Sequence, residues 1–157
     1  MKIILLVVGK TNEKFLTEAI SIFEKRLKHY ISFQIEVIPE LKNTKHLSIG
    51  QQKEKEAELI LKQLQEGDDV ILLDEKGTSY TSKGFADLLE KKMSIGIKRL
   101  VFVVGGPYGF APKMYERAQE KISFSKMTFS HQLIRLIFVE QIYRAFTIMK
   151  GEPYHHE

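Results

Sequence analysis

Residues 3–8 read IILLVV, an uninterrupted run of large apolar side chains. A run that does not alternate with polar residues predicts a strand covered on both faces, as strands of parallel sheets are. Further strand-like runs follow, each separated from the next by a segment with helical spacing, at residues 33–38, 70–73, 100–104 and 122–124. Regular alternation of strands and helices predicts an α/β fold with a mostly parallel sheet and helices on both faces.

The chain has 157 residues and no long linker, which predicts a single domain spanning 1–157. It contains no cysteine, so disulfides and thiolate metal sites are excluded. The run at 3–8 is too short for a signal peptide, and no apolar stretch reaches the roughly 20 residues of a membrane helix. We therefore expect a cytoplasmic protein that does not associate with membranes.

The formal net charge of +4 favours an anionic partner, with nucleic acid first, although only weakly. Lysines gather in the stretch 42–55. That stretch is either an ordinary solvated surface or a contact for an RNA backbone.

Glycines cluster directly after the strand at 100–104, in the sequence GGPYG at 105–109. Glycine allows close approach of the backbone to a ligand and positive φ angles, but a tight turn needs the same residues. The spacing differs from the GxGxxG fingerprint and follows the wrong strand, which argues against a nicotinamide-dependent oxidoreductase. We expect that a side chain at Gly105 would invade a ligand site.

A second loop, Phe124–Phe129, leads into a helix expected at 130–150. Its backbone amides precede a helix N-terminus and can bind a hydrogen-bond acceptor, although an ordinary capping loop explains them as well. The helix is apolar around nearly its whole circumference, which indicates burial on all sides by a partner subunit in a homodimer or by the interior of a monomer. Glu140 and Arg144 are spaced for an ion pair within this helix.

The chain ends in Tyr-His-His-Glu at 154–157, and paired histidines beside a tyrosine suit proton transfer near neutral pH. His131, at the start of the last helix, is either a cap or a site residue. The histidines lack HxxxH or HExxH spacing, so no metal site is expected.

Three motifs occur in a fixed order, GGPYG, SFSKMTF-HQ-IR and EQIYRAF-IM-GEPYH, together with IILLVVGK and LLDEKG nearer the N-terminus. In this order and spacing the chain closely resembles the bacterial 23S rRNA pseudouridine-N3 methyltransferases of the SPOUT class, over essentially its whole length. Ser130 stands where many relatives have proline. Both residues suit the start of a helix, so the difference changes little.

The resemblance implies a deep trefoil knot formed by the C-terminal segment and a homodimer that binds S-adenosylmethionine without a metal. It implies a 23S rRNA substrate in the assembled 70S ribosome. The cofactor contacts carried over are Leu73, Gly105, Phe124, Ser125, Lys126, Met127, Thr128 and Phe129.

For catalysis we expect His155 as the base, Tyr154 stacking on the substrate base or closing the site, and Arg144 near it. A backbone or water-mediated route for the proton is the alternative to His155. Arg144, Arg135 and Lys126 are candidates for phosphate contacts. Two other functions stay open, a knotted methyltransferase for another RNA such as tRNA and a non-enzymatic ribosome-associated RNA-binding factor.

Overall fold

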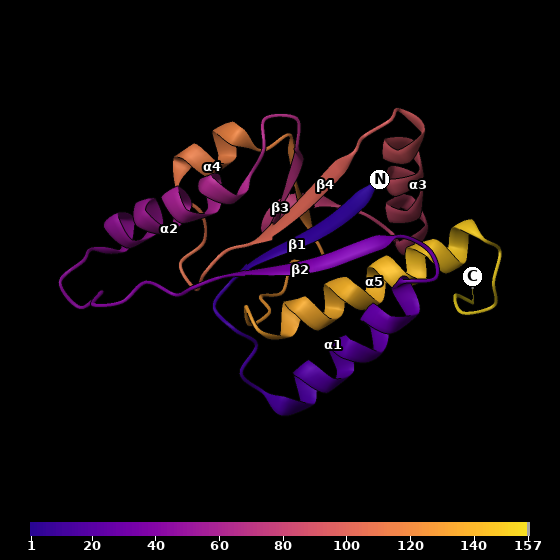
Figure 1. Ribbon diagram of the computed structural model, residues 1–157, viewed down its shortest axis with the longest axis horizontal. Helices are drawn as coiled ribbons and strands as arrows, with labels where there is room; N and C mark the ends of the chain where they lie inside the picture. Colours follow the sequence, from indigo (N-terminus) through magenta and orange to yellow (C-terminus); the bar gives the residue numbers. More distant parts are fainter. Residues whose placement is uncertain (157) are drawn as a thin grey trace.

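A five-stranded sheet in the order β2-β1-β4-β3-β5 forms the centre of the protein, and every neighbouring pair of strands is parallel. The computed structural model describes residues 1–156 (Figure 1). The strands are β1 (Lys2–Val8), β2 (Ser32–Ile38), β3 (Asp69–Ser79), β4 (Arg99–Val104) and β5 (Glu120–Ser123). The prediction of an α/β fold with a parallel sheet is confirmed. Within the described residues no helix is long and apolar enough to span a membrane.

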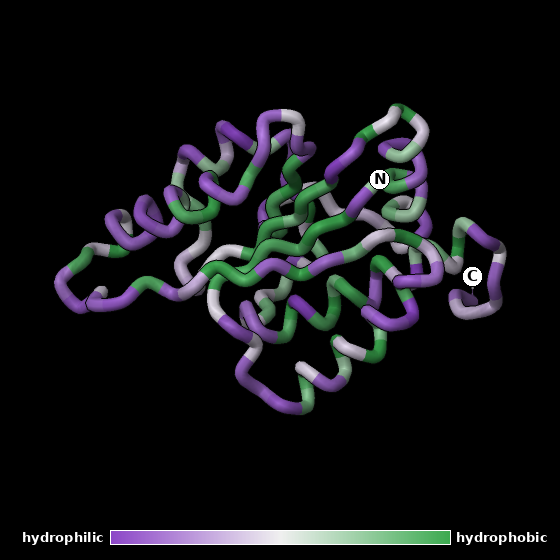
Figure 2. Tube along the Cα trace, viewed as in Figure 1, coloured by the Kyte–Doolittle hydropathy of each residue, from purple (hydrophilic) through white to green (hydrophobic). Residues whose placement is uncertain are grey.

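Helices cover both faces of this sheet (Figure 1). One face packs against α1 (Lys14–Leu27), α3 (Ser82–Ser94) and α5 (Leu133–Met149), and the other against α2 (Ile49–Gln63) and α4 (Pro112–Arg117). The strands supply both cores because their side chains alternate: Ile3 and Leu5 face the α1 side, whereas Ile4 and Leu6 face the α2 side. Figure 2 shows this apolar centre as green strands enclosed by helices with purple outer faces.

Helix α5 lies between the sheet, α1 and α3, which bury most of its apolar circumference within one chain. Phe138, Val139 and Ile142 are fully buried, whereas Leu133 near its start is 38% exposed. Its all-round apolar pattern therefore does not by itself require a partner subunit.

Side chains cap the N-termini of helices α2 and α3. Ser48 accepts a hydrogen bond from the Gln51 amide and forms a capping box with that residue. Helix α3 is capped by Thr81, whose hydroxyl accepts from the Gly84 amide at 2.9 Å.

Strand β3 extends beyond the run predicted at 70–73, because its pairing with β5 breaks after Leu73 and resumes at Thr78. Gly77 lies in this irregular stretch, and a Cβ there would come within 2.6 Å of the Ile122 nitrogen. A glycine is therefore required where the two backbones approach each other most closely.

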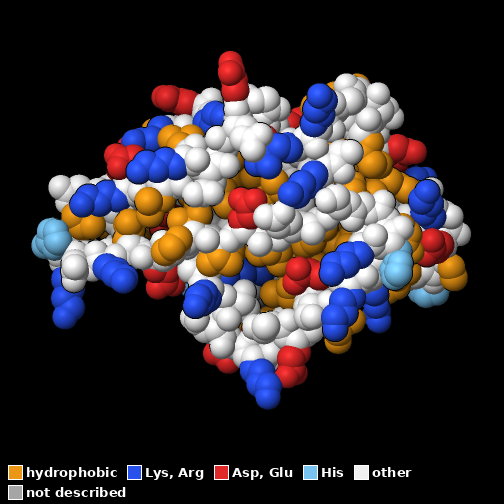
Figure 3. Space-filling view, in the orientation of Figure 1, with side chains coloured by type: hydrophobic (Ala, Val, Ile, Leu, Met, Phe, Trp, Pro, Cys, Tyr) orange, Lys and Arg blue, Asp and Glu red, His pale blue; other side chains and the backbone are white. Residues whose placement is uncertain are grey.

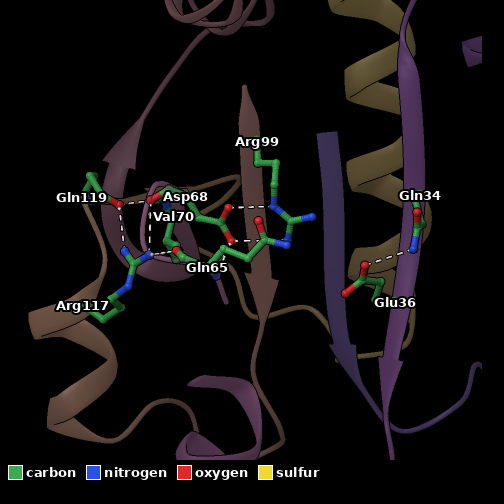
Figure 4. A network of polar contacts seen from close by, with 8 residues as sticks. All are labelled: Gln34, Glu36, Gln65, Asp68, Val70, Arg99, Arg117 and Gln119. Carbon is green, nitrogen blue, oxygen red and sulfur yellow. Dashed lines mark hydrogen bonds and ion pairs between the residues drawn. The ribbon is translucent and has the colours of Figure 1, made fainter. Parts of the chain in front are cut away.

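At the amino ends of the strands, Asp68 is the centre of a polar network (Figure 4). Its side chain is 1% exposed and accepts hydrogen bonds from the Gln65 amide at 2.8 Å and from Arg99 Nε at 2.7 Å. Arg117 donates to the carbonyls of Gln65 and Asp68, and Gln119 accepts from the Val70 amide. The network fixes the start of β3 against β4 and the segment after α4.

Replacing Asp68 by alanine should destabilise the protein by about 2–4 kcal/mol, because Arg99 and the Gln65 amide lose a buried acceptor. The measurement is urea denaturation followed by circular dichroism. Glu66→Ala removes an exposed carboxylate from the same turn and is the control, with an expected change of under about 0.5 kcal/mol. Equal stability of the two variants would contradict the role assigned to this network.

Candidate functional site

A cavity of about 440 Å³ opens where the carboxyl ends of β3, β4 and β5 meet the start of α5. Seven of the eight predicted cofactor contacts line it, namely Leu73, Gly105, Phe124, Ser125, Met127, Thr128 and Phe129. Lys126 is exposed and is not among the lining residues. The structure therefore brings the strand ends and the second loop together, as expected for a ligand site of an α/β sheet.

The pairing of β3 with β4 and with β5 brings these residues together. Leu73 pairs with Val104 of β4 on one side and with Ile122 of β5 on the other. All of these residues lie at the wall of the cavity. Leu73, Val104 and Ile122 thus lie side by side across the sheet at this wall.

The glycine loop, residues 105–109, folds back on itself after β4. The Gly109 amide donates to the Gly106 carbonyl at 3.1 Å, and Gly109 has a φ of +84°, which favours glycine. A Cβ on Gly105 would meet the Phe110 ring at 3.1 Å, and Phe110 itself lines the cavity. Gly105 is therefore needed for packing against Phe110, and the expectation that a side chain there would invade the ligand site stays a prediction.

The loop Phe124–Phe129 is stiffened by its own hydroxyl groups. Ser123 Oγ donates to the Ser125 carbonyl at 2.8 Å, and Ser125 Oγ accepts from the Met127 amide at 2.9 Å. Thr128 Oγ1 donates to Glu75 Oε2 at 2.8 Å, which ties the loop to the segment after Leu73. The loop is therefore held in place from both sides of the cavity.

Two carboxylates, Asp74 and Glu75, and the hydroxyl of Tyr115 also line the cavity and were not predicted from the sequence. The hydroxyl of Tyr115, from α4, donates a short hydrogen bond to Asp74. Burial, with this hydrogen bond as the second cause, raises the pKa of Tyr115 to about 12. Tyr115 thus stays a protonated donor at neutral pH. Asp74 and Glu75 belong to the LLDEKG motif, from which only Leu73 was expected to contact a ligand.

Arg135 is 1% exposed, so the prediction that it contacts phosphate is wrong. Its guanidinium donates to the carbonyls of Val8 and Gly9, to Thr11 Oγ1 and, through Nε, to the carbonyl of His131. Burial lowers the pKa of Arg135 from its usual value, and nearby Glu40 opposes this effect. Arg135 therefore ties the end of β1 to the start of α5 instead of facing solvent.

Gln132 makes a second tie between the same segments. Its side-chain amide donates to the Lys10 carbonyl at 3.0 Å and accepts from the Asn12 amide at 2.9 Å. Between them, Gln132 and Arg135 fix the position of His131, which lines the cavity.

The predicted catalytic residues form a separate cluster at the far end of α5. Arg144 donates to Glu140 Oε1 at 2.6 Å and contacts His155 Nδ1 at 2.9 Å. The Tyr154 hydroxyl donates to the same Glu140 oxygen at 2.9 Å, and the centre of the Tyr154 ring lies 4.8 Å from Arg144 Cζ. Burial, followed by the bond to Glu140, raises the pKa of Tyr154. The ion pair expected between Glu140 and Arg144 is confirmed.

This cluster does not meet the cavity within one chain. Ile134 lines the cavity, and Arg144 follows ten residues later, which is roughly 15 Å along a helix. Figure 1 shows the C-terminal tail at the end of α5 remote from the strand ends that form the cavity. The structure thus describes two half-sites, a cavity and a tail cluster. Glu157, the last residue of the predicted tail, lies outside the described residues.

Among residues 1–156, no group of three or more His, Cys, Asp or Glu side chains is arranged to hold a metal ion. Figure 3 shows basic side chains spread over one face of the molecule with acidic ones between them. On this face the charges do not gather into a single basic patch.

Comparisons with known proteins agree with this architecture. A family model described as "Predicted SPOUT methyltransferase" matches residues 1–155. The chain is 66% identical over 157 residues to a protein of Phocaeicola vulgatus named ribosomal RNA large subunit methyltransferase H, with 100% of both chains covered. Proteins of the same name from Parabacteroides distasonis, 64% identical over 100% of both chains, and Christiangramia forsetii, 56% identical over 99% of both, are also similar. A match along nearly the whole chain, together with this level of identity, shows that the protein belongs to the SPOUT methyltransferase family.

Proposed function

We propose that this protein transfers a methyl group from S-adenosylmethionine to N3 of a pseudouridine in 23S rRNA of the assembled ribosome. The observation that carries the proposal is the convergence of Leu73, Gly105 and the loop Phe124–Phe129 on one cavity in a member of this family. The relatives' name, ribosomal RNA large subunit methyltransferase H, supports the class of substrate. This function places the protein in the cytoplasm.

The residues of the cavity fit S-adenosylmethionine. A volume of about 440 Å³ lies within the roughly 300–1,000 Å³ of small-molecule sites. Leu73, Ile122 and Ile134 supply an apolar wall suited to a purine ring. Asp74 and Glu75 supply negative charge, and Lys53 and Lys76 supply positive charge elsewhere in the lining. When bound, S-adenosylmethionine supplies an activated methyl group on a cationic sulfonium, so negative charge nearby is favourable.

Methyl transfer forms the bond from carbon to N3 as the bond from carbon to sulfur breaks, and the proton on N3 must leave. Placing N3 in line with the methyl group accounts for a large part of the catalysis. We assign removal of the proton to His155. Because the Arg144 guanidinium donates to Nδ1 in the described arrangement, the neutral imidazole carries its proton on Nε2. Nδ1 therefore accepts the N3 proton only when the substrate displaces Arg144 from it, and Arg144 is then available to a phosphate.

We propose that a second copy of the chain brings its tail cluster to the cavity, so that the active protein is a homodimer. The distance along α5 separates the two half-sites within one chain. An apolar surface is available for the contact, since Phe15 and Ile22 of α1 are 64% and 51% exposed and lie two helical turns apart on one face.

We also infer that the C-terminal segment threads through an upstream loop to form a trefoil knot, as membership of the family implies. Knots are rare exceptions among protein folds. An experimental structure tests this inference, and a chain path that is unthreaded would contradict it.

The function is tested by incubating the protein with S-adenosylmethionine and purified 70S ribosomes. Mass spectrometry of the RNA should then show one added methyl group on a pseudouridine of 23S rRNA. Methylation of tRNA instead would contradict the assigned substrate. If calorimetry shows no saturable binding of S-adenosylmethionine, the protein is a binding factor rather than an enzyme.

His155→Ala should lower kcat by on the order of 100-fold, because a positioned base contributes about that much or more. Its affinity for S-adenosylmethionine should change much less than kcat, because the role assigned to His155 is removal of the N3 proton and not binding of the donor. His156→Ala, a change at the exposed neighbouring histidine, is the control and should retain activity. A His155→Ala variant with the kcat of the wild type would show that the proton leaves by another route.

Mixing two inactive variants tests whether the tail acts on the partner's cavity. Thr128→Trp should block the cavity, and His155→Ala disables the tail. If each site combines the cavity of one chain with the tail of the other, one site in each mixed dimer is intact. An equal mixture should then recover roughly a quarter of the wild-type rate. No recovery in verified mixed dimers would show that each chain uses its own tail.

A further inference from the structure

Glu56 is a buried carboxylate that the mechanism does not yet use. It lies on α2 and is 7% exposed. Its Oε1 accepts a hydrogen bond from the Gly106 amide at 2.9 Å. Gly106 lines the cavity whereas Glu56 does not, so Glu56 contacts a residue of the cavity wall without lining the cavity itself.

The fit between Glu56 and Gly106 is close. A Cβ on Gly106 would lie 2.6 Å from Glu56 Oε2 and 3.1 Å from Oε1, so the carboxylate occupies the space of the missing side chain. The φ angle of Gly106 is not in the left-handed region, where glycine is favoured. The close fit at Gly106 therefore comes from the approach of the Glu56 side chain and not from backbone conformation.

The neighbouring carboxylates of α2 have a different role. Glu54 and Glu58 pair with Lys113 of α4, at 2.8 and 3.9 Å, and attach the two helices to each other. Glu56 lies between them in sequence and points to the other side of the helix, as a residue two positions away must. Its contact with the glycine loop is thus separate from the packing of α2 on α4.

Burying a carboxylate costs free energy that a single amide donor does not fully recover. Burial raises the pKa of Glu56, and the Gly106 hydrogen bond opposes the shift. An apolar side chain at this place would fill the same space without that cost. The carboxylate is therefore better explained by the loop that it holds than by the stability of the fold.

We propose that Glu56 is a positioning residue. It orients the peptide bond between Gly105 and Gly106, so that the glycine loop presents its backbone to the methyl donor. The inference rests on the proposed binding of S-adenosylmethionine in this cavity. Glu56 acts through Gly106 and does not touch the reacting atoms, so its loss should weaken donor binding more than it slows the chemical step.

The test compares Glu56→Ala with Glu56→Gln, using calorimetry with S-adenosylmethionine and methyl transfer to 70S ribosomes. Glu56→Ala should raise Kd and KM for S-adenosylmethionine roughly tenfold, while kcat changes less than about threefold, because uniform binding is lost. Glu56→Gln keeps an oxygen that accepts the Gly106 amide and should recover most of the affinity. Glu58→Ala, an exposed change on the same helix, is the control and should bind as the wild type does.

Gly106→Ala tests the same contact from the other side, because the new methyl group must displace the carboxylate. Alone it should weaken binding about as much as Glu56→Ala. In the Glu56→Ala background its further effect should be much smaller, since the space is then free. Thermal denaturation of each variant shows that the chain is folded before binding is measured. If Glu56→Ala fails to fold, Glu56→Gln and Gly106→Ala still decide the question.

Three results would overturn the inference. A folded Glu56→Ala variant with wild-type Kd and KM would show that the contact does not matter for the donor. Independent effects of Glu56→Ala and Gly106→Ala in the double variant would show that they do not act through one contact. A wild-type protein that does not bind S-adenosylmethionine would overturn the proposed function and this inference together, whereas the first two results leave the proposed function intact.

Discussion

Parallel pairing of β3 between β4 and β5 is the constraint on which the site depends. Because the strands run in one direction, their carboxyl ends meet at one edge of the sheet. Leu73 lies opposite both Val104 and Ile122, so a register shift of one residue in either pair would separate the loops that follow. The two apolar cores on either side of the sheet oppose such a shift, since it would turn core side chains toward the wrong face.

Polar contacts hold the ends of the strands and the loops that follow them. At the amino ends, buried Asp68 holds the start of β3, and at the carboxyl ends Arg135 and Gln132 hold the loop after β1 against α5. Thr128 and Glu75 close the cavity from the remaining side. The cavity is therefore lined by segments that side-chain hydrogen bonds hold in place. Such preorganisation reduces the loss of entropy when a ligand binds.

Much of the fold followed from periodicity. The apolar run at 3–8 and the β-α alternation predicted the parallel sheet, because such strands have no polar face. Helix caps were less predictable, since Thr81 and Ser82 are chemically similar neighbours and only the backbone decides which of them accepts the Gly84 amide. The extension of β3 was missed because its pairing depends on β5, almost 50 residues away.

The site was predicted in part by its glycines and hydroxyls, and more fully by resemblance to a family. Arg135 shows the limit of inference from residue type, because an arginine usually lies at the surface and here satisfies four backbone and hydroxyl acceptors in the core. Glu56 lies on a helix 50 residues before Gly106 in sequence, and Tyr115 lies on a helix between two of the motifs. No local pattern reveals that they reach the wall of the cavity.

The Arg135 contacts also bear on when the protein becomes competent during its synthesis. Arg135 Nη2 donates to the carbonyl of Val8 across a sequence separation of 127 residues. Long-range contacts of this kind slow folding, because a large loop must close before they form. The nascent chain therefore cannot finish the loop after β1 until α5 has left the exit tunnel.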